Sequence, residues 1–185
     1  KVAHGQLQGA GPEERARKVT GVVGAGSGRV RSRGWGLAAV GASVAVNELG
    51  GEAADETAAA MRDAGGNALT VSGNVTRASD VSELVDRTVS ELGGLHILVN
   101  AAGVLRRTAV FDMPADEWDF VIDVNLKGTF LPSQAVLPAM RDAGWGRIVN
   151  FSSTAGKTTS TLGSAAYTAS KHAVLGLTRH LAMEE

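Results

Sequence analysis

Tyr167 and Lys171, near the C-terminal end of the sequence, could together move a proton on or off a C–O group. They stand four residues apart, just over one helical turn, so on a helix both side chains would lie on one face. A free phenol titrates near ~10 and is a poor acid or base at neutral pH, but a neighbouring ammonium favours the phenolate. Ser152 and Ser153 lie upstream, and a serine hydroxyl could hold a substrate oxygen against the phenol. This set predicts proton transfer, although Tyr-x-x-x-Lys alone also fits an ordinary helix with a packed tyrosine and a solvated lysine.

The elements that must position these side chains alternate between short apolar runs and helical segments. Strands are expected at residues 19–23, 43–46, 68–71, 95–99 and 147–151. Helices are expected at residues 52–63, 79–92 and 165–185, and residues 114–140 are expected to form one long helix or a pair of helices. There is room for one more helix between the first two strands. The repeated alternation is typical of an α/β protein with a doubly wound parallel sheet. We therefore expect one domain at residues 18–185, preceded by a flexible leader at residues 1–17 that is rich in Gly, Gln and charge.

The composition excludes several classes of function. Hydrophobic residues make up 44% of the chain and charged residues 20%, which is typical of a globular protein. A formal net charge of -1 provides no basic field for nucleic acid or an anionic membrane. There is no cysteine for thiol catalysis, and the four histidines are too scattered for a metal site. No apolar run is long enough to cross a bilayer, so we expect a cytoplasmic protein that acts on small molecules without a metal.

Two further features point to a dinucleotide. Gly24, Gly26, Ser27 and Gly28 directly follow the first predicted strand, where glycines allow a pyrophosphate to approach the backbone at the start of a helix. A plain glycine-rich turn would have the same composition. Glu48 stands at the end of the second strand, where an acidic residue can accept hydrogen bonds from the adenosine ribose and repel a 2′-phosphate. NAD is therefore favoured over NADP, unless Glu48 is only a solvated loop carboxylate.

Taken together, the chain resembles the short-chain dehydrogenase/reductase family. The matching residues, in the family's order, are Gly24–Gly28, Asn100-Ala101-Ala102-Gly103, Asn125, Ser152-Ser153, and Tyr167 with Lys171. The resemblance extends from Lys18 to the C-terminal end. It implies a Rossmann-like fold and NAD(P)-dependent interconversion of a secondary alcohol and a ketone. The segment that begins at Ser152 most resembles 3-oxoacyl-carrier-protein reductase-like members.

The resemblance also implies roles for single residues. Tyr167 would be the catalytic acid or base, and Lys171 would favour its phenolate and hold the nicotinamide ribose. Ser153 would orient the substrate oxygen, with Ser152 as the alternative because one extra residue separates the pair from the tyrosine. Asn125 would hold a water in a proton relay. The cofactor would contact Gly24, Gly26, Ser27, Gly28, Glu48, Asn74, Val75, Asn100, Ala101, Ala102, Gly103, Tyr167 and Lys171.

The chain departs from the family pattern at several places, of which three bear most on the site and the fold. Residues 29–35 are arginine-rich, and Val30 replaces a glycine, so we expect weaker cofactor binding. Asn74 replaces an Asp that contacts adenine, although its amide oxygen could still accept a hydrogen bond from an amino group. The family continues past the Tyr-Lys helix with more strands and a lid, which implies an incomplete sheet whose fifth strand and last helix expose apolar surface.

The resemblance leaves two further expectations about the whole protein. Members of the family often form dimers or tetramers through the helices around Asn125 and Tyr167, so we expect a homo-oligomer. The alternative to an enzyme is a non-catalytic nucleotide-binding or scaffold fragment of the same fold. The altered glycine loop and the missing last strands favour this alternative, whereas the complete set of Ser, Tyr, Lys and Asn opposes it.

Overall fold

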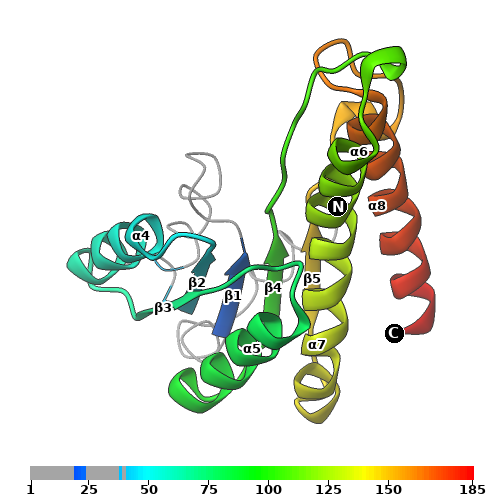
Figure 1. Cartoon of the computed structure of the whole chain (residues 1–185). Helices are drawn as coiled ribbons and strands as arrows, with labels where there is room; N and C mark the ends of the chain where they lie inside the picture. The colour runs from blue at the N-terminus through cyan, green and yellow to red at the C-terminus, as the bar shows by residue number, and fades with distance from the viewer. Residues whose placement is uncertain (1–18, 24–37, 39–40) are drawn as a thin grey trace.

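The core of the protein is a parallel five-stranded sheet. The structure, a computed structural model, describes residues 19–23, 38 and 41–185 (Figure 1). Its strands follow the order β3-β2-β1-β4-β5. They are β1 (Val19–Val23), β2 (Ser43–Glu48), β3 (Ala68–Ser72), β4 (Ile97–Asn100) and β5 (Arg147–Asn150). The order reverses between β1 and β4, which is where open α/β sheets bind ligands. The doubly wound α/β fold predicted from the sequence is confirmed, while the glycine cluster at 24–28 and residues 1–17 and 29–35 lie outside the described residues.

Helices cover both faces of the sheet, and in Figure 1 α4 lies apart from α5 and α7. They are α4 (Gly51–Asp63), α5 (Ala78–Leu92), α6 (Ala115–Ile122), α7 (Gly128–Asp142) and α8 (Ala165–Glu184). A π-helical turn, η2 (Asp123–Lys127), joins α6 to α7, and the short 3₁₀ turns are η1 (Val110–Asp112) and η3 (Thr154–Gly156). No helix in this described part of the chain combines the length and hydrophobicity needed to cross a membrane.

Two apolar cores form because alternate residues of each strand point to opposite faces. Ile97 and Val99 of β4 pack in the core under α4. Leu98, between them, packs in the other core with Val136 and Met140 of α7. All four residues of β4 are buried. Burial on both faces of the sheet explains why residues 97–99 are all apolar.

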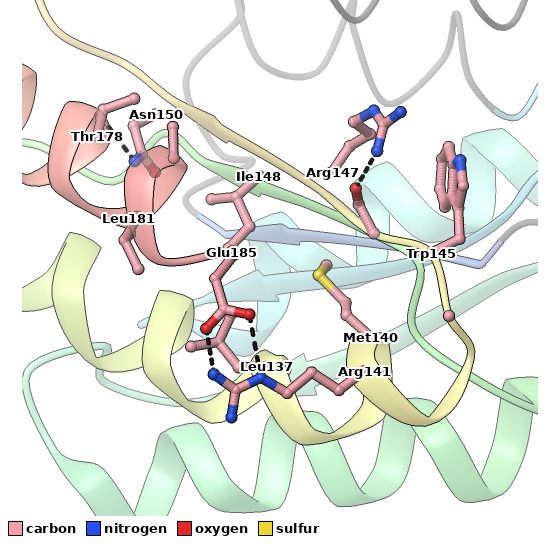
Figure 2. Close-up of a pocket in the computed structure, with 13 residues that line it drawn as sticks. Leu137, Met140, Arg141, Trp145, Arg147, Ile148, Asn150, Thr178, Leu181 and Glu185 are labelled. Atoms are coloured by element: carbon pink, nitrogen blue, oxygen red, sulfur yellow. Dashed lines mark hydrogen bonds and ion pairs between the residues drawn. The ribbon is translucent and has the colours of Figure 1, made fainter.

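Strand β5 differs because it lies at the edge of the described sheet. All four of its residues are only half-buried, and β4 is its one partner among the described strands. A cavity of about 490 Å³ lies between β5, α7 and α8, where Leu137, Ile148 and Leu181 surround it (Figure 2). Arg141 on α7 pairs with Glu185 at its rim, with 3.0 Å between Nε and Oε2. The fifth strand and the last helix thus expose apolar surface, as the sequence predicted.

Candidate active site

The carboxyl ends of the parallel strands bring distant parts of the sequence to one edge of the sheet. In the strand register Val23 of β1 pairs with Asn47 of β2 and with Asn100 of β4. Asn100 in turn pairs with Asn150 of β5. The segments that follow these strands therefore start at the same level. The segments after β2, β3 and β4 line a cavity that is described below, and the segment after β5 carries Ser152 and Ser153.

A cavity of about 560 Å³ lies at this edge, beside the switch point. It is lined by Asn47, Glu48, Leu49, Gly73, Asn74, Val75, Thr76, Ala101, Ala102, Gly103, Val104, Phe120, Asp123 and Val124. Six of the residues predicted to contact a cofactor are thus brought together: Glu48, Asn74, Val75, Ala101, Ala102 and Gly103. Tyr167 and Lys171 do not line this cavity, although Lys171 adjoins it at Gly103.

Asn100 is the predicted cofactor residue that lies behind the cavity wall. It is 2% exposed, and its Nδ2 donates to Ser133 Oγ and Asn150 Oδ1, both at 2.9 Å. These bonds tie β4 to α7 and β5, which is the bracing of the central sheet that buried amides provide. Its Oδ1 is buried and has no hydrogen-bond partner among the described residues.

Asn47 is a cavity residue that the sequence analysis missed. Its Nδ2 donates to Val71 O at 2.8 Å and to Gly73 O at 3.3 Å, so it fixes the end of β3 against β2. The signal in the sequence was an amide directly after the apolar run at residues 43–46, because an amide that becomes buried there requires hydrogen-bond partners.

Asn125 is fully buried in the π-helical turn between α6 and α7, a local widening that is frequent at functional sites. Its Oδ1 accepts from Val104 N at 2.7 Å. Its Nδ2 donates to Val104 O and to Ser170 Oγ, each at 3.0 Å. Both amide protons are therefore used, and one lone pair of Oδ1 remains. Through these bonds Asn125 joins the loop after β4 to helix α8.

Lys171 lies on α8 and is also buried, at 6% exposure. Its Nζ donates to Phe151 O at 2.8 Å and lies 5.9 Å from the centre of the Tyr167 ring. Burial lowers the pKa of Lys171 below its usual value of 10.5, because the charged ammonium loses hydration. None of the ion pairs formed within the described residues involves Lys171.

Gly103 marks the place where the cavity meets Asn125 and Lys171. A Cβ at this glycine would lie 3.3 Å from Asn125 Oδ1 and 3.5 Å from Lys171 Nζ. Two of the side chains predicted to take part in proton transfer, Asn125 and Lys171, therefore adjoin the cavity predicted to hold the cofactor.

Tyr167 is positioned by the first turn of α8. The N-cap residue Ser164 accepts from Tyr167 N through its Oγ at 3.4 Å, and Ser164 N donates to Arg106 O at 2.7 Å. The Tyr167 carbonyl accepts from Ser170 Oγ at 2.7 Å, which links it onward to Asn125. The tyrosine is half-buried, and its hydroxyl takes part in none of the hydrogen bonds among the described residues.

The two serines after β5 have different partners. Ser152 Oγ donates to Lys171 O at 2.7 Å, so its proton is committed to the backbone of α8. Ser153 Oγ accepts from Ala155 N at 3.2 Å and caps the short turn η3. Its own proton is used by no hydrogen bond within the described part of the chain.

Comparison with known proteins assigns the chain to a family. The sequence model of the short chain dehydrogenase family matches residues 18–185, and the chain belongs to that family. It is 38% identical over 174 residues to a hydroxyacyl-CoA dehydrogenase of Mycobacterium tuberculosis, covering 87% of this chain and 54% of that protein. It is 38% identical over 168 residues to a 3-oxoacyl-[acyl-carrier-protein] reductase of Synechocystis, covering 90% of this chain and 68% of that protein.

A solved structure supports the same assignment. A short-chain type dehydrogenase/reductase from Mycobacterium marinum superposes with a TM-score of 0.87 at 34% identity, covering 90% of this chain and 68% of that one. The chain thus spans between about half and two thirds of the lengths of these relatives. The fold implied by the family resemblance is confirmed.

Proposed function

We propose that this protein is an NAD(P)-dependent oxidoreductase that interconverts a secondary alcohol and a ketone. The observation that carries the proposal is the buried Lys171 ammonium. It lies 5.9 Å from the centre of the Tyr167 ring and beside Gly103, which lines the cavity at the switch point of the sheet. A proton-transfer pair thus adjoins a place suited to a dinucleotide.

The residues around the cavity suit the adenosine half of that cofactor. Glu48, at the end of β2, would accept hydrogen bonds from the ribose. Asn74 and Val75, after β3, would face the base. Gly103 leaves open a space that a Cβ would fill, where the cofactor would pass toward Lys171. When bound, the nicotinamide would donate a hydride to the substrate carbon or accept one from it.

The proton would be moved by Tyr167. In the direction of reduction its phenol would donate to the substrate oxygen, and Lys171 would favour the resulting phenolate. Ser153 is the better candidate for orienting that oxygen, because Ser152 already donates its proton to Lys171 O. A relay water would bind at the remaining lone pair of Asn125 Oδ1, close to Lys171 Nζ.

The relatives suggest a substrate class and an assembly. Two are named for 3-oxoacyl-carrier-protein and hydroxyacyl-CoA substrates, so we propose an oxoacyl or hydroxyacyl thioester. We also propose a homodimer or homotetramer, because Trp118 on α6 and Phe130 on α7 expose 40% and 41% of their surface. A cytoplasmic location is proposed as well.

Binding and turnover of NADH separate the enzyme from its rival, a nucleotide-binding scaffold of the same fold. NADH fluorescence would be followed while the protein is added, and a 3-oxoacyl thioester would then be supplied. Binding followed by oxidation of NADH supports the enzyme. Binding without turnover, in this chain and in a chimera that carries the remaining segment of the Synechocystis relative, would favour the scaffold.

The first prediction concerns the choice between the two cofactors. We expect a higher kcat/KM with NADH than with NADPH, because the Glu48 carboxylate would repel a 2′-phosphate. Glu48→Ala should narrow this preference, whereas the control Glu52→Ala, at an exposed position on α4, should leave it unchanged. A clear preference of the unaltered protein for NADPH would refute the assignment.

The second prediction concerns recognition of the adenine base of the cofactor by Asn74. Asn74 Oδ1 accepts from Thr76 N at 3.0 Å and from Thr76 Oγ1 at 2.9 Å, so the group left to face a base is the amide Nδ2, a donor. Asn74→Asp would replace that donor by an acceptor for the adenine amino group and keep the bonds to Thr76. A hydrogen bond to a charged group contributes about 1.5 kcal/mol or more, so we expect NADH to bind about tenfold more tightly.

Titration calorimetry would measure this gain, with the NADH analogue that carries unsubstituted purine in place of adenine as the control ligand. That compound lacks the amino group and has no N–H donor on this edge of the base, so Asn74→Asp should not strengthen its binding. An equal gain for both ligands would show that Asn74 does not contact this edge of the base.

A further inference from the structure

The ring of Tyr167 packs against Gly163, in the turn that precedes α8. A Cβ built at Gly163 would lie 2.7 Å from Tyr167 Cδ1, 3.0 Å from Tyr167 Cγ and 3.0 Å from Ser160 Oγ. Its shortest contact would thus be with the tyrosine ring, at a distance that carbon atoms do not reach without displacement. The described glycines with positive φ are Gly41, Gly65, Gly93, Gly94 and Gly144, and Gly163 is not among them. The backbone at 163 would thus accept other residues, and the glycine is required by space alone.

The turn that carries Gly163 is held in place from two sides. Ser160 Oγ accepts from Gly163 N at 2.7 Å and from Leu162 N at 3.2 Å. Ser160 N donates to Thr168 Oγ1 on α8 at 3.3 Å. On the other side of the glycine, Ser164 N donates to Arg106 O at 2.7 Å. Because both flanks are anchored, a side chain at 163 would displace the tyrosine ring more readily than the turn.

We propose that Gly163 is a positioning residue for Tyr167. Because Gly163 has no side chain, the anchored turn can pack closely against the ring of Tyr167. This contact holds the phenol beside Lys171. The backbone of Tyr167 is held by Ser164 and Ser170, but these bonds do not by themselves set the torsions χ1 and χ2 of the ring. The packing of Gly163 against the ring adds a restraint on them. The inference rests on the proposed function insofar as Tyr167 acts on the proton.

The position of the ring can be measured without any turnover, because Tyr167 is the one tyrosine in the chain. Selective labelling of tyrosine gives a single set of ring signals in NMR spectra. In the unaltered protein we expect nuclear Overhauser contacts from these ring protons to the α-protons of Gly163 and to the ε-methylene of Lys171. In Gly163→Ala the contact to Lys171 should be lost and the ring signals should shift.

Gly176→Ala is the matched control, because it makes the same change on α8 itself. Gly176 is exposed, and nothing lies within 4 Å of its ideal Cβ. In Gly176→Ala the Tyr167 ring signals and the contact between Tyr167 and Lys171 should match those of the unaltered protein. Unchanged signals and an unchanged Lys171 contact in Gly163→Ala as well would overturn the proposal.

Kinetics give a second readout. A misplacement of about 1 Å can cost roughly 100-fold in rate, so we expect Gly163→Ala to lower kcat by about 100-fold. The dissociation constant of NADH and the KM of the carbonyl substrate should stay within about twofold. A raised KM with unchanged kcat would contradict positioning and make Gly163 a wall of the substrate site. If Tyr167→Phe keeps full activity while Gly163→Ala still moves the ring, the proposed function fails and the packing relation stands.

Ser160→Ala also tests whether the turn at Gly163 positions the Tyr167 ring, and it adds no atom to the turn. It provides the test of the proposal if Gly163→Ala does not fold. It removes the acceptor that holds Gly163 N and Leu162 N, so the turn should loosen from the ring. We expect broadened tyrosine ring signals and a kcat lowered about tenfold. Sharp, unshifted ring signals and an unchanged kcat in Ser160→Ala would contradict the proposal.

Discussion

Tyr167→Phe should abolish turnover while leaving NADH binding nearly intact. General acid–base groups contribute about 10²–10⁴-fold in rate, and the variant loses only the hydroxyl. Since this hydroxyl makes no hydrogen bond with the described residues, its removal leaves no buried partner unsatisfied. The phenylalanine ring should still pack on Gly163, so the free energy of unfolding should change by less than about 0.5 kcal/mol.

Steady-state kinetics and NADH titration measure the two effects separately. Thr161→Val, which removes an exposed hydroxyl from the turn before α8, is the control and should leave kcat unchanged. A loss below about threefold in Tyr167→Phe would show that another group transfers the proton. A loss of NADH affinity in parallel would show instead that the hydroxyl serves cofactor binding.

Much of the fold was predictable because its signals are local. The apolar run from Ile97 to Val99 is buried on both faces, so its residues show neither helical nor alternating polarity. The last helix was predicted at residues 165–185 and is found at Ala165–Glu184, where Ser164 supplies the cap. Patterns of this kind depend on neighbours in the sequence, and they transfer directly to the structure.

The site was predictable only in part, because its geometry depends on residues far apart in the sequence. The family resemblance predicts a role for Asn125 in proton transfer, but it does not predict that the amide of Asn125 holds Val104 and Ser170. It left Ser152 and Ser153 as alternatives, and the difference between them is a bond from Ser152 to the backbone of α8. Close approaches such as that of Gly163 to the ring of Tyr167 leave no periodic signal. The expected effect of Val30 on cofactor binding stays a prediction, since this residue lies outside the described residues.

Lys171→Met should remove activity and also change how stability depends on pH. Methionine keeps a similar apolar stem, so the packing of α8 should be retained, while loss of the ammonium should lower kcat by about 100-fold or more. The bond to Phe151 O is lost at every pH, and its cost is therefore a constant offset. The contribution to the unfolding free energy that varies with pH comes from the hydration that the buried ammonium loses. This loss lowers the pKa of Lys171 in the folded protein.

The sign of the pH effect follows from proton linkage. Because the pKa of Lys171 is lower in the folded chain than its usual 10.5, the unfolded chain binds more protons between these two values, and stability gains from this group as the pH rises. Below the pKa of Lys171 in the folded protein the lysine is charged in both states, and the full desolvation cost weighs on the folded protein. Lys171→Met does not carry this cost, so its stability relative to the unaltered protein should be greatest below that pKa and should decline as the pH rises toward the usual value of 10.5.

Urea unfolding of both proteins at neutral pH and in steps up to about pH 10 measures this difference. Lys157→Met, at the exposed lysine that follows the short turn η3, is the matched control. Its difference in unfolding free energy from the unaltered protein should not vary with pH. A pH-independent difference for Lys171→Met as well would mean that the ammonium is solvated in solution. A difference that instead grows in favour of Lys171→Met with rising pH would mean that a negative charge beside Lys171, such as a Tyr167 phenolate, outweighs the cost of burying the ammonium.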